Sequence, residues 1–205
     1  MRTRCAALLV LVMVAATATA QAVTHTTLAP QAAGTVRLLP FLNIFETTSM
    51  TDLYSTCFNT TGTNLEFRRG FMEFAIPAFR KNVDKATLVI SDVSGTFSSA
   101  PTPPDVHEVS YYAADLQVDT SDYDAPATPI GTFETSINDD PDVYTIEFDV
   151  TQLVSQFQGA NLGFRIKLQG DPQQTCNGGT GAYFGGLFIY PPILKITSRG
   201  TPGPQ

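Results

Sequence analysis

The densest group of candidate metal ligands is an acidic segment. Four aspartates, Asp115, Asp119, Asp122 and Asp124, fall within ten residues. Calcium binds several oxygen atoms at short range, and carboxylates in a turn can supply them. The segment lacks the mid-loop glycine and the terminal glutamate of an EF-hand, and aspartate is common in turns because its side chain caps backbone amides. Two interpretations therefore stay open, a calcium site and a capped turn.

The tyrosines are the candidate sugar-binding residues, because the chain has no tryptophan and flat aromatic rings with a polar tip suit a partly wet surface. Tyr111 and Tyr112 are adjacent, so in a strand one of the two rings points away from the core. Tyr123 and Tyr183 lie in or beside expected turns. The other interpretation is that these four tyrosines are half-buried packing residues, which is the commoner environment for tyrosine.

The chain has no recognisable catalytic motif. Its two histidines are His25 and His107, and it contains neither a Gly-x-Ser-x-Gly turn nor a two-histidine metal motif. His107 and Glu108 would face opposite sides of a strand, which predicts a surface histidine at position 107. Paired carboxylates of a glycosidase meet only in space. A secreted polysaccharide-active hydrolase of unrecognised type therefore remains the alternative to a non-catalytic module.

The first 22 residues have the order of a signal peptide. Arg2 and Arg4 precede an apolar run over residues 6–16, and small residues then allow cleavage after Ala20 or Ala22. The run is shorter than the roughly 20 apolar residues that cross a bilayer, although a retained anchor is the competing interpretation. We therefore expect a secreted or cell-surface protein, with no membrane span in the mature chain.

In an oxidising compartment the two remaining cysteines, Cys57 and Cys176, predict one disulfide. Both lie in polar stretches that read as turns. A metal site would need further ligands nearby, and two free thiols are the remaining alternative. Cys5 precedes the apolar run and is expected to leave with the signal peptide.

Charge limits the partners of the protein. The 205 residues include 12 basic and 19 acidic side chains, a formal net charge of -7. A phosphate polyanion would be repelled, so nucleic-acid binding is not expected. Hydrophobic residues make up 43% of the chain, which is enough to form a core.

The hydrophobic pattern predicts strands. Within residues 162–168, Phe164 and Ile166 are expected to face the core, while Arg165 and Lys167 face the solvent. Further strands are expected over residues 36–44, 66–76, 85–93, 106–113, 130–135, 142–150, 182–189 and 193–197, and one short helix over 150–157. Eight or nine short strands between turns predict an all-β fold, a single antiparallel β-sandwich of jelly-roll type.

These strands fix the expected boundaries. The signal peptide occupies residues 1–22, a flexible lead-in 23–33, the sandwich 34–198 and a disordered tail 199–205. Exposed sheet edges in such a fold make self-association available, so a structural role at the cell surface is a further interpretation.

Several segments, in order along the chain, resemble a known family. Residues 69–77 (Arg-Gly-Phe-Met-Glu-Phe-Ala-Ile-Pro) and 85–90 (Lys-Ala-Thr-Leu-Val-Ile) are similar to the opening of the DNRLRE and carbohydrate-binding-module-96 type of exported bacterial jelly roll. Residues 149–151 (Asp-Val-Thr), 162–166 (Leu-Gly-Phe-Arg-Ile) and 191–196 (Pro-Pro-Ile-Leu-Lys-Ile) resemble its later strands. The resemblance implies an extracellular sandwich that binds polysaccharide or forms part of a surface structure. The glycine- and asparagine-rich early segment typical of that group is weak here, and the C-terminal sorting anchor of many relatives is missing.

Overall fold

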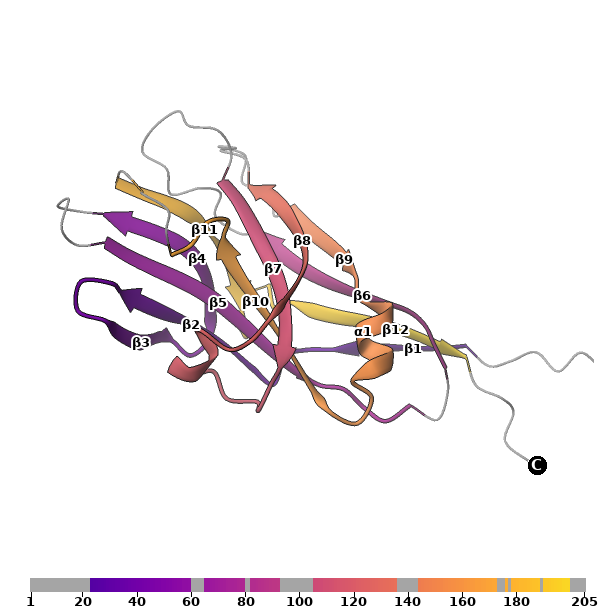
Figure 1. Cartoon of the computed structure of the whole chain (residues 1–205). Coiled ribbons are helices and arrows are strands. Elements are labelled where there is room, and N and C mark those ends of the chain that lie inside the picture. The colour runs from indigo at the N-terminus through magenta and orange to yellow at the C-terminus, as the bar shows by residue number, and fades with distance from the viewer. Residues whose placement is uncertain are drawn as a thin grey trace, which may run out of the picture.

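The computed structural model describes residues 23–59, 65–79, 82–92, 105–135, 144–172, 176, 178–188 and 190–199, and two antiparallel sheets packed together form its body (Figure 1). The predicted all-β sandwich is confirmed. The expected signal peptide and most of the C-terminal tail lie outside the described residues. No helix in the described part of the chain is long and apolar enough to cross a membrane.

The smaller sheet has four strands in the order β1-β12-β6-β9, with β1 at Val23–Leu28, β12 at Ile193–Arg199, β6 at Asn82–Asp92 and β9 at Tyr144–Asp149. The flexible lead-in expected over residues 23–33 is wrong, because β1 pairs with β12 along its whole length. The side chains of β1 are mostly polar and exposed. Its strand conformation therefore comes from backbone pairing with β12 and not from an apolar face.

The larger sheet has eight strands and surrounds the long strand β5. Its main path is β11-β4-β5-β10-β7-β8, and the hairpin β2–β3 joins it through β2 and β5. The bounds are β2 Ala32–Leu39, β3 Ile44–Ser49, β4 Asp52–Asn59, β5 Leu65–Ala75, β7 Asp105–Ala113, β8 Thr128–Thr135, β10 Asn161–Leu168 and β11 Gly178–Gly186. Sequence patterns did not predict β1, β3 and β4.

Two strands, first β4 and then β10, pair with the same edge of β5. Phe67 lies between β2 and β4, whereas Met72 lies between β2 and β10. Both β4 and β10 therefore lie on the edge of β5 opposite β2. β4 pairs with the first part of β5, and β10 pairs with the second part. Gly70 stands where they meet, and a Cβ there would lie 3.2 Å from the Cβ of Leu53 on β4. The glycine lets β4 approach closely before the two branches of the sheet separate.

The main core lies between the two sheets. Phe164 and Ile166 of β10 are fully buried in it, as predicted, and Phe164 meets Phe74 edge to face at 6.0 Å. The expected short helix is also present as α1, Thr151–Gln156, which contributes Val154 to the core. Apolar burial on this scale supplies most of the stabilisation of the fold.

A second apolar cluster covers the opposite face of the large sheet. It consists of Val36, Leu38, Phe71, Tyr112, Val118 and Tyr123. The segment over residues 114–127, which includes the 3-10 turn η1 at Thr120–Asp122, supplies its outer side. Both faces of the central strands are consequently covered. For this reason the expected exposure of Arg165 is wrong, and only 8% of this residue is accessible.

The predicted disulfide between Cys57 and Cys176 is confirmed, with the two Cα atoms 6.1 Å apart. It joins β4 to the stretch that precedes β11, across a sequence separation of 119 residues. Cys57 lies within a strand and not in the turn suggested by its polar neighbours. The bridge is buried against Phe67 and Leu168 in a small apolar cluster of its own.

Candidate functional site

The aspartates of the acidic segment lie in one loop, but three of them cap local backbone amides. Asp115 accepts a hydrogen bond from the amide of Gln117 at 2.9 Å, and Asp119 accepts one from Ser121 at 2.7 Å. Asp122 accepts one from the amide of Asp119 at 2.9 Å, completing a capping box. The hydrogen bonds from Ser121 hold the pKa of Asp119 below its usual value.

The fourth aspartate, Asp124, makes a peripheral 3.5 Å ion pair with Arg69. Among the described residues no three His, Cys, Asp or Glu side chains gather closely enough to hold a metal ion. The geometry of this loop therefore matches the capped-turn interpretation.

Two buried arginines occupy the space beneath this loop. The Arg69 guanidinium donates to both carboxylate oxygens of Asp171, at 2.8 and 3.2 Å, and to the carbonyl of Tyr123. Arg165 Nη1 donates to the carbonyls of Tyr123 and Ala125 at 2.9 and 3.2 Å. Internal cations thus bind the backbone oxygens of the loop, and this charge-assisted network fixes the loop on the sheet.

Tyr112 and Tyr123 are buried, which removes them as sugar-stacking residues. The Tyr112 hydroxyl donates to Glu73 Oε1 at 2.6 Å, and its ring lies against Gly163, where a Cβ would come within 2.5 Å of the ring. Tyr123 lies with its ring under the Arg69 guanidinium at 3.7 Å. Tyr111 is half-buried against Phe157 of the helix end. These three tyrosines are packing residues.

Glu73 is fully buried, and burial raises the pKa of its carboxyl to about 7. Its Oε2 atom has no hydrogen-bond partner among the described residues. The carboxyl is therefore partly protonated near neutral pH, where it would otherwise be ionised.

The prediction that His107 is a surface histidine is wrong. Its ring is fully buried, with Nδ1 2.9 Å from the Ser55 hydroxyl and Nε2 3.2 Å from the Thr135 hydroxyl. Burial lowers the pKa of His107 to about 3, so the ring is neutral at physiological pH. Ser55 is also fully buried. This serine–histidine contact is closed to a substrate and is a structural hydrogen bond.

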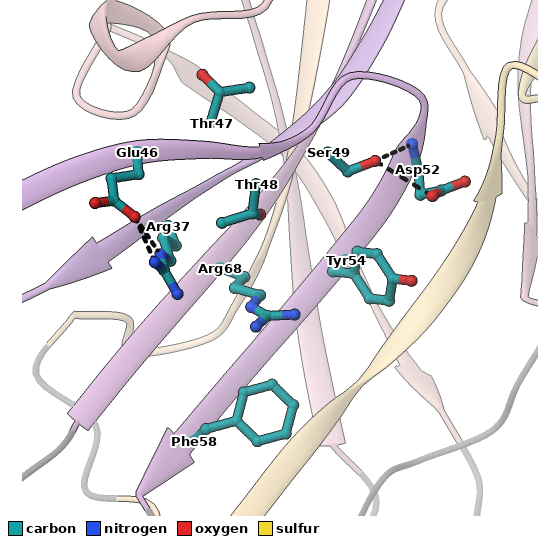
Figure 2. A pocket seen from close by; sticks show the side chains of 9 residues that line it. All are labelled: Arg37, Glu46, Thr47, Thr48, Ser49, Asp52, Tyr54, Phe58 and Arg68. Carbon is teal, nitrogen blue, oxygen red and sulfur yellow. Dashed lines mark hydrogen bonds and ion pairs between the residues drawn. The ribbon is translucent and has the colours of Figure 1, made fainter.

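A groove on the described surface lies where β2, β3, β4 and β5 meet, and its volume is about 700 Å³ (Figure 2). It is lined by Arg37, Glu46, Thr47, Thr48, Ser49, Asp52, Tyr54, Phe58 and Arg68. Arg68 shares a face of β5 with the core residues Met72 and Phe74, because side chains two positions apart point the same way. The groove is thus the continuation of the core-facing side of β5 along the part that pairs with β4.

Aromatic rings and an arginine form the centre of the groove. Tyr54 stacks on Tyr183 of β11 with ring centroids 5.0 Å apart and an interplanar angle of 29°. The Tyr183 hydroxyl donates to Asp52 at 3.3 Å. The Arg68 guanidinium lies 5.8 Å from the Tyr54 ring and 5.2 Å from the Phe58 ring, and Figure 2 shows it between them. Of the four tyrosines singled out by sequence, only Tyr183 belongs to this arrangement.

Ion pairs hold the charged side chains of the groove in place. Arg37 Nε donates to Glu46 at 2.9 Å, and Arg37 Nη1 lies 3.6 Å from Glu66. Hydrogen bonding to Glu46 raises the pKa of Arg37. Arg68 Nε donates to Glu66 at 2.5 Å, whereas no described residue binds the Nη1 and Nη2 atoms of Arg68. Two guanidinium nitrogens, which carry four N–H donors, therefore remain available beside two aromatic rings.

Sequence reasoning missed Tyr54, Phe58 and Arg68. The available signal was the alternation within β4, in which Tyr54 and Phe58 fall on one face and Leu53 and Cys57 on the other. Because both faces carry apolar side chains, this strand lacks the contrast that marks a half-buried strand.

Comparison with known proteins identifies no family. No family model matches the chain, and no curated protein matches it. Among solved structures, the chain is similar to the stem and receptor-binding domain of the spike protein P1 from bacteriophage PM2. The two chains are 8% identical, and the match covers 90% of this chain and 99% of that chain with a TM-score of 0.27. A likeness of this extent supports no conclusion about function.

Proposed function

We propose that this protein is an exported, non-catalytic module that binds extracellular polysaccharide in the groove between β3 and β4. The observation that carries the proposal is the placement of Arg68 between the rings of Tyr54 and Phe58, where its Nη1 and Nη2 atoms make no hydrogen bond to a described residue. Aromatic faces bind the apolar face of a sugar ring, and the guanidinium donates to its hydroxyl oxygens. The resemblance to carbohydrate-binding jelly rolls supports the same class of ligand.

The charges of the groove favour a neutral polysaccharide. Arg37 and Arg68 face three carboxylates, those of Glu46, Asp52 and Glu66. The whole chain carries a formal net charge of -7. The carboxylates of the groove and the net negative charge of the chain would both repel an acidic polysaccharide. The hydroxyls of a neutral sugar can donate to the carboxylates and accept from the arginines.

Export is part of the proposal and has its own support. The buried Cys57–Cys176 bridge is typical of proteins that fold in an oxidising compartment, and the first 22 residues have the order of a signal peptide. Intact-mass measurement of protein recovered from the extracellular fraction should give a chain that starts at Gln21 or Val23. Recovery of a chain that still carries Met1 would contradict export by cleavage.

The binding proposal is tested with an array of neutral and uronic-acid polysaccharides, probed with the chain from Val23 onward. We expect binding to neutral members, at the same strength with calcium or with EDTA, because the aspartates of the 115–124 loop are engaged in caps and an ion pair. Tyr54→Ala should weaken binding about fivefold, since a stacked ring contributes roughly 1 kcal/mol, whereas Tyr54→Phe should keep it.

Arg68→Ala should weaken binding by a similar factor. Lys195→Ala is the matched control, because Lys195 is an exposed, ion-paired cation on the other sheet. If Tyr54→Ala and Arg68→Ala bind like the wild-type chain, the groove is not the site. If no polysaccharide binds, the proposed function fails.

A further inference from the structure

The aromatic residues of the groove continue along the β4–β11 pair beyond the groove itself. In the ladder Tyr54 is directly opposite Tyr183, and Asp52 is opposite Gly186. Directly opposed residues of an antiparallel pair point to the same face. Phe58 follows Tyr54 along β4 by four residues, on the same face, and is opposite Gly179. The face thus carries Phe58, Tyr54 and Tyr183 in a row.

The pairing extends one further step, into the turn before β4. The amide of Leu187 donates to the carbonyl of Thr51 at 2.8 Å. Phe188 is the residue that follows this contact, just beyond the end of β11 and next to the Asp52–Gly186 pair. Side-chain alternation supports this placement, because Leu187 packs against the main core and Phe188 points the other way.

Phe188 and Met50 are unusually exposed for residues of their type. Phe188 is 82% accessible and Met50 64%. Neither contributes to the apolar clusters of the described residues. Large apolar side chains left in solvent next to a candidate binding site are a common mark of ligand contact.

Glycines hold β11 close to β4 beside these rings. Gly181 and Gly186 stand opposite Thr56 and Asp52 on the groove face. A Cβ would come within 2.1 Å of the Ser55 carbonyl oxygen at Gly181 and within 1.9 Å of the Thr51 oxygen at Gly186. Only glycine allows β11 to approach β4 this closely, and both glycines are buried in the contact between the two strands.

We propose that this face is a linear binding track for an extended, neutral polysaccharide chain, which runs from Phe58 past the Tyr54–Tyr183 stack to Phe188. The proposal rests on the proposed function and specifies its ligand. Six residues of β4 separate Phe58 from Asp52, about 20 Å at a strand rise of about 3.3 Å per residue, and Phe188 lies beyond Asp52. A track of this length contacts several consecutive sugar rings inside a chain and does not select a chain end.

The test measures affinity for a length series, from disaccharide to octasaccharide, prepared from the polysaccharide that binds best on the array. Wild-type affinity should rise with chain length until the track is filled. Phe188→Ala should weaken octasaccharide binding about tenfold and leave disaccharide binding unchanged. Tyr54→Ala should weaken binding at every length.

The matched control is Phe41→Ala, an equally exposed phenylalanine, 72% accessible, at the opposite end of the β2–β3 hairpin. Thermal melting of both phenylalanine variants should match the wild type, because neither side chain is packed. Equal affinity for all lengths, or an octasaccharide affinity that Phe188→Ala does not change, overturns the track while the groove remains the site. Full binding by Tyr54→Ala instead overturns the proposed function.

Discussion

Arg165 holds the loop that covers the large sheet, although alternation along β10 places this residue on the polar face of the strand. Its guanidinium reaches the carbonyls of Tyr123 and Ala125 in the loop that covers the sheet. Alternation alone would assign Arg165→Ala a cost below about 1 kcal/mol, the value for a surface substitution. The contacts instead predict that Arg165→Ala lowers the free energy of unfolding by about 2–3 kcal/mol, because the buried carbonyls lose a charged hydrogen-bond donor.

Urea denaturation of Arg165→Ala measures this cost. Phe164→Ala should cost about 3–5 kcal/mol through the cavity it leaves, and Lys195→Ala should be close to neutral because Lys195 is exposed. A loss for Arg165→Ala as small as that for Lys195→Ala would show that the loop does not depend on this arginine.

The buried carboxyl of Glu73 makes stability depend on pH. Tyr112, Asp122 and Asp115 are the groups that face it, and burial with the two like charges raises its pKa from 4.5 to about 7. The folded state therefore binds the Glu73 proton more tightly than the unfolded state does. The stabilisation of the folded state by this proton is fully present below pH 4.5. It is lost as the pH rises through about 7, and it amounts in total to about 3 kcal/mol.

Glu73→Gln removes this ionisation. Relative to the wild type, the variant should gain stability as the pH rises from about 4.5 to 7, and the difference should then stay constant. Chemical denaturation at several pH values gives the comparison. A difference between the two proteins that does not vary with pH would mean that Glu73 ionises in the folded state as it does in the unfolded one.

Alternation predicts correctly which side chains are buried where one face of a strand lies against the main core. Phe164 and Ile166 are buried as alternation requires. Arg165 and His107 were assigned to solvent, yet both are buried. Alternation tells which residues share a face, but not whether another part of the chain covers that face. The covering loop over residues 114–127 is polar and irregular, so nothing in its own pattern indicated that it packs on the sheet.

At the level of elements, the strands that sequence missed are those held by their neighbours. β1 carries almost no apolar face and forms by pairing with β12. β4 is apolar on both faces and was hidden by the polar residues around Cys57. Because β4 supplies Asp52, Tyr54 and Phe58, missing this strand also meant missing the groove.

The Cys57–Cys176 bridge ties β4 to the chain just before β11, which pairs with it. Changing both cysteines to alanine should lower the free energy of unfolding by about 2–5 kcal/mol, chiefly because the reduced unfolded chain gains freedom. The wild type kept in reductant should match the double variant in the same denaturation series. Peptide mapping of exported protein without reductant should recover one linked pair, and two alkylated thiols would contradict the bridge.

On the scale of the whole molecule, the two sheets differ in what covers them. The large sheet is packed on the small sheet on one side and under the 114–127 loop on the other. Its β4–β11 branch carries the groove, since β4 and β10 separate at Gly70. The division of β5 between two neighbours therefore separates the stabilising part of the sheet from the part available to a ligand.

The small sheet ends at β1, and this strand protects the edge of β12. Val23 is also the first residue expected after cleavage at Ala22, so the mature chain would begin with this edge strand. A chain shortened to start at Pro30 loses the six-residue pairing with β12 and the contact of Leu28 with the core. It should be less stable, and the open backbone edge of β12 should pair with other molecules. Sedimentation velocity over a concentration series measures this association, with the chain starting at Val23 as the control. If both chains sediment alike at every concentration, β1 does not act as the protecting edge of the sheet.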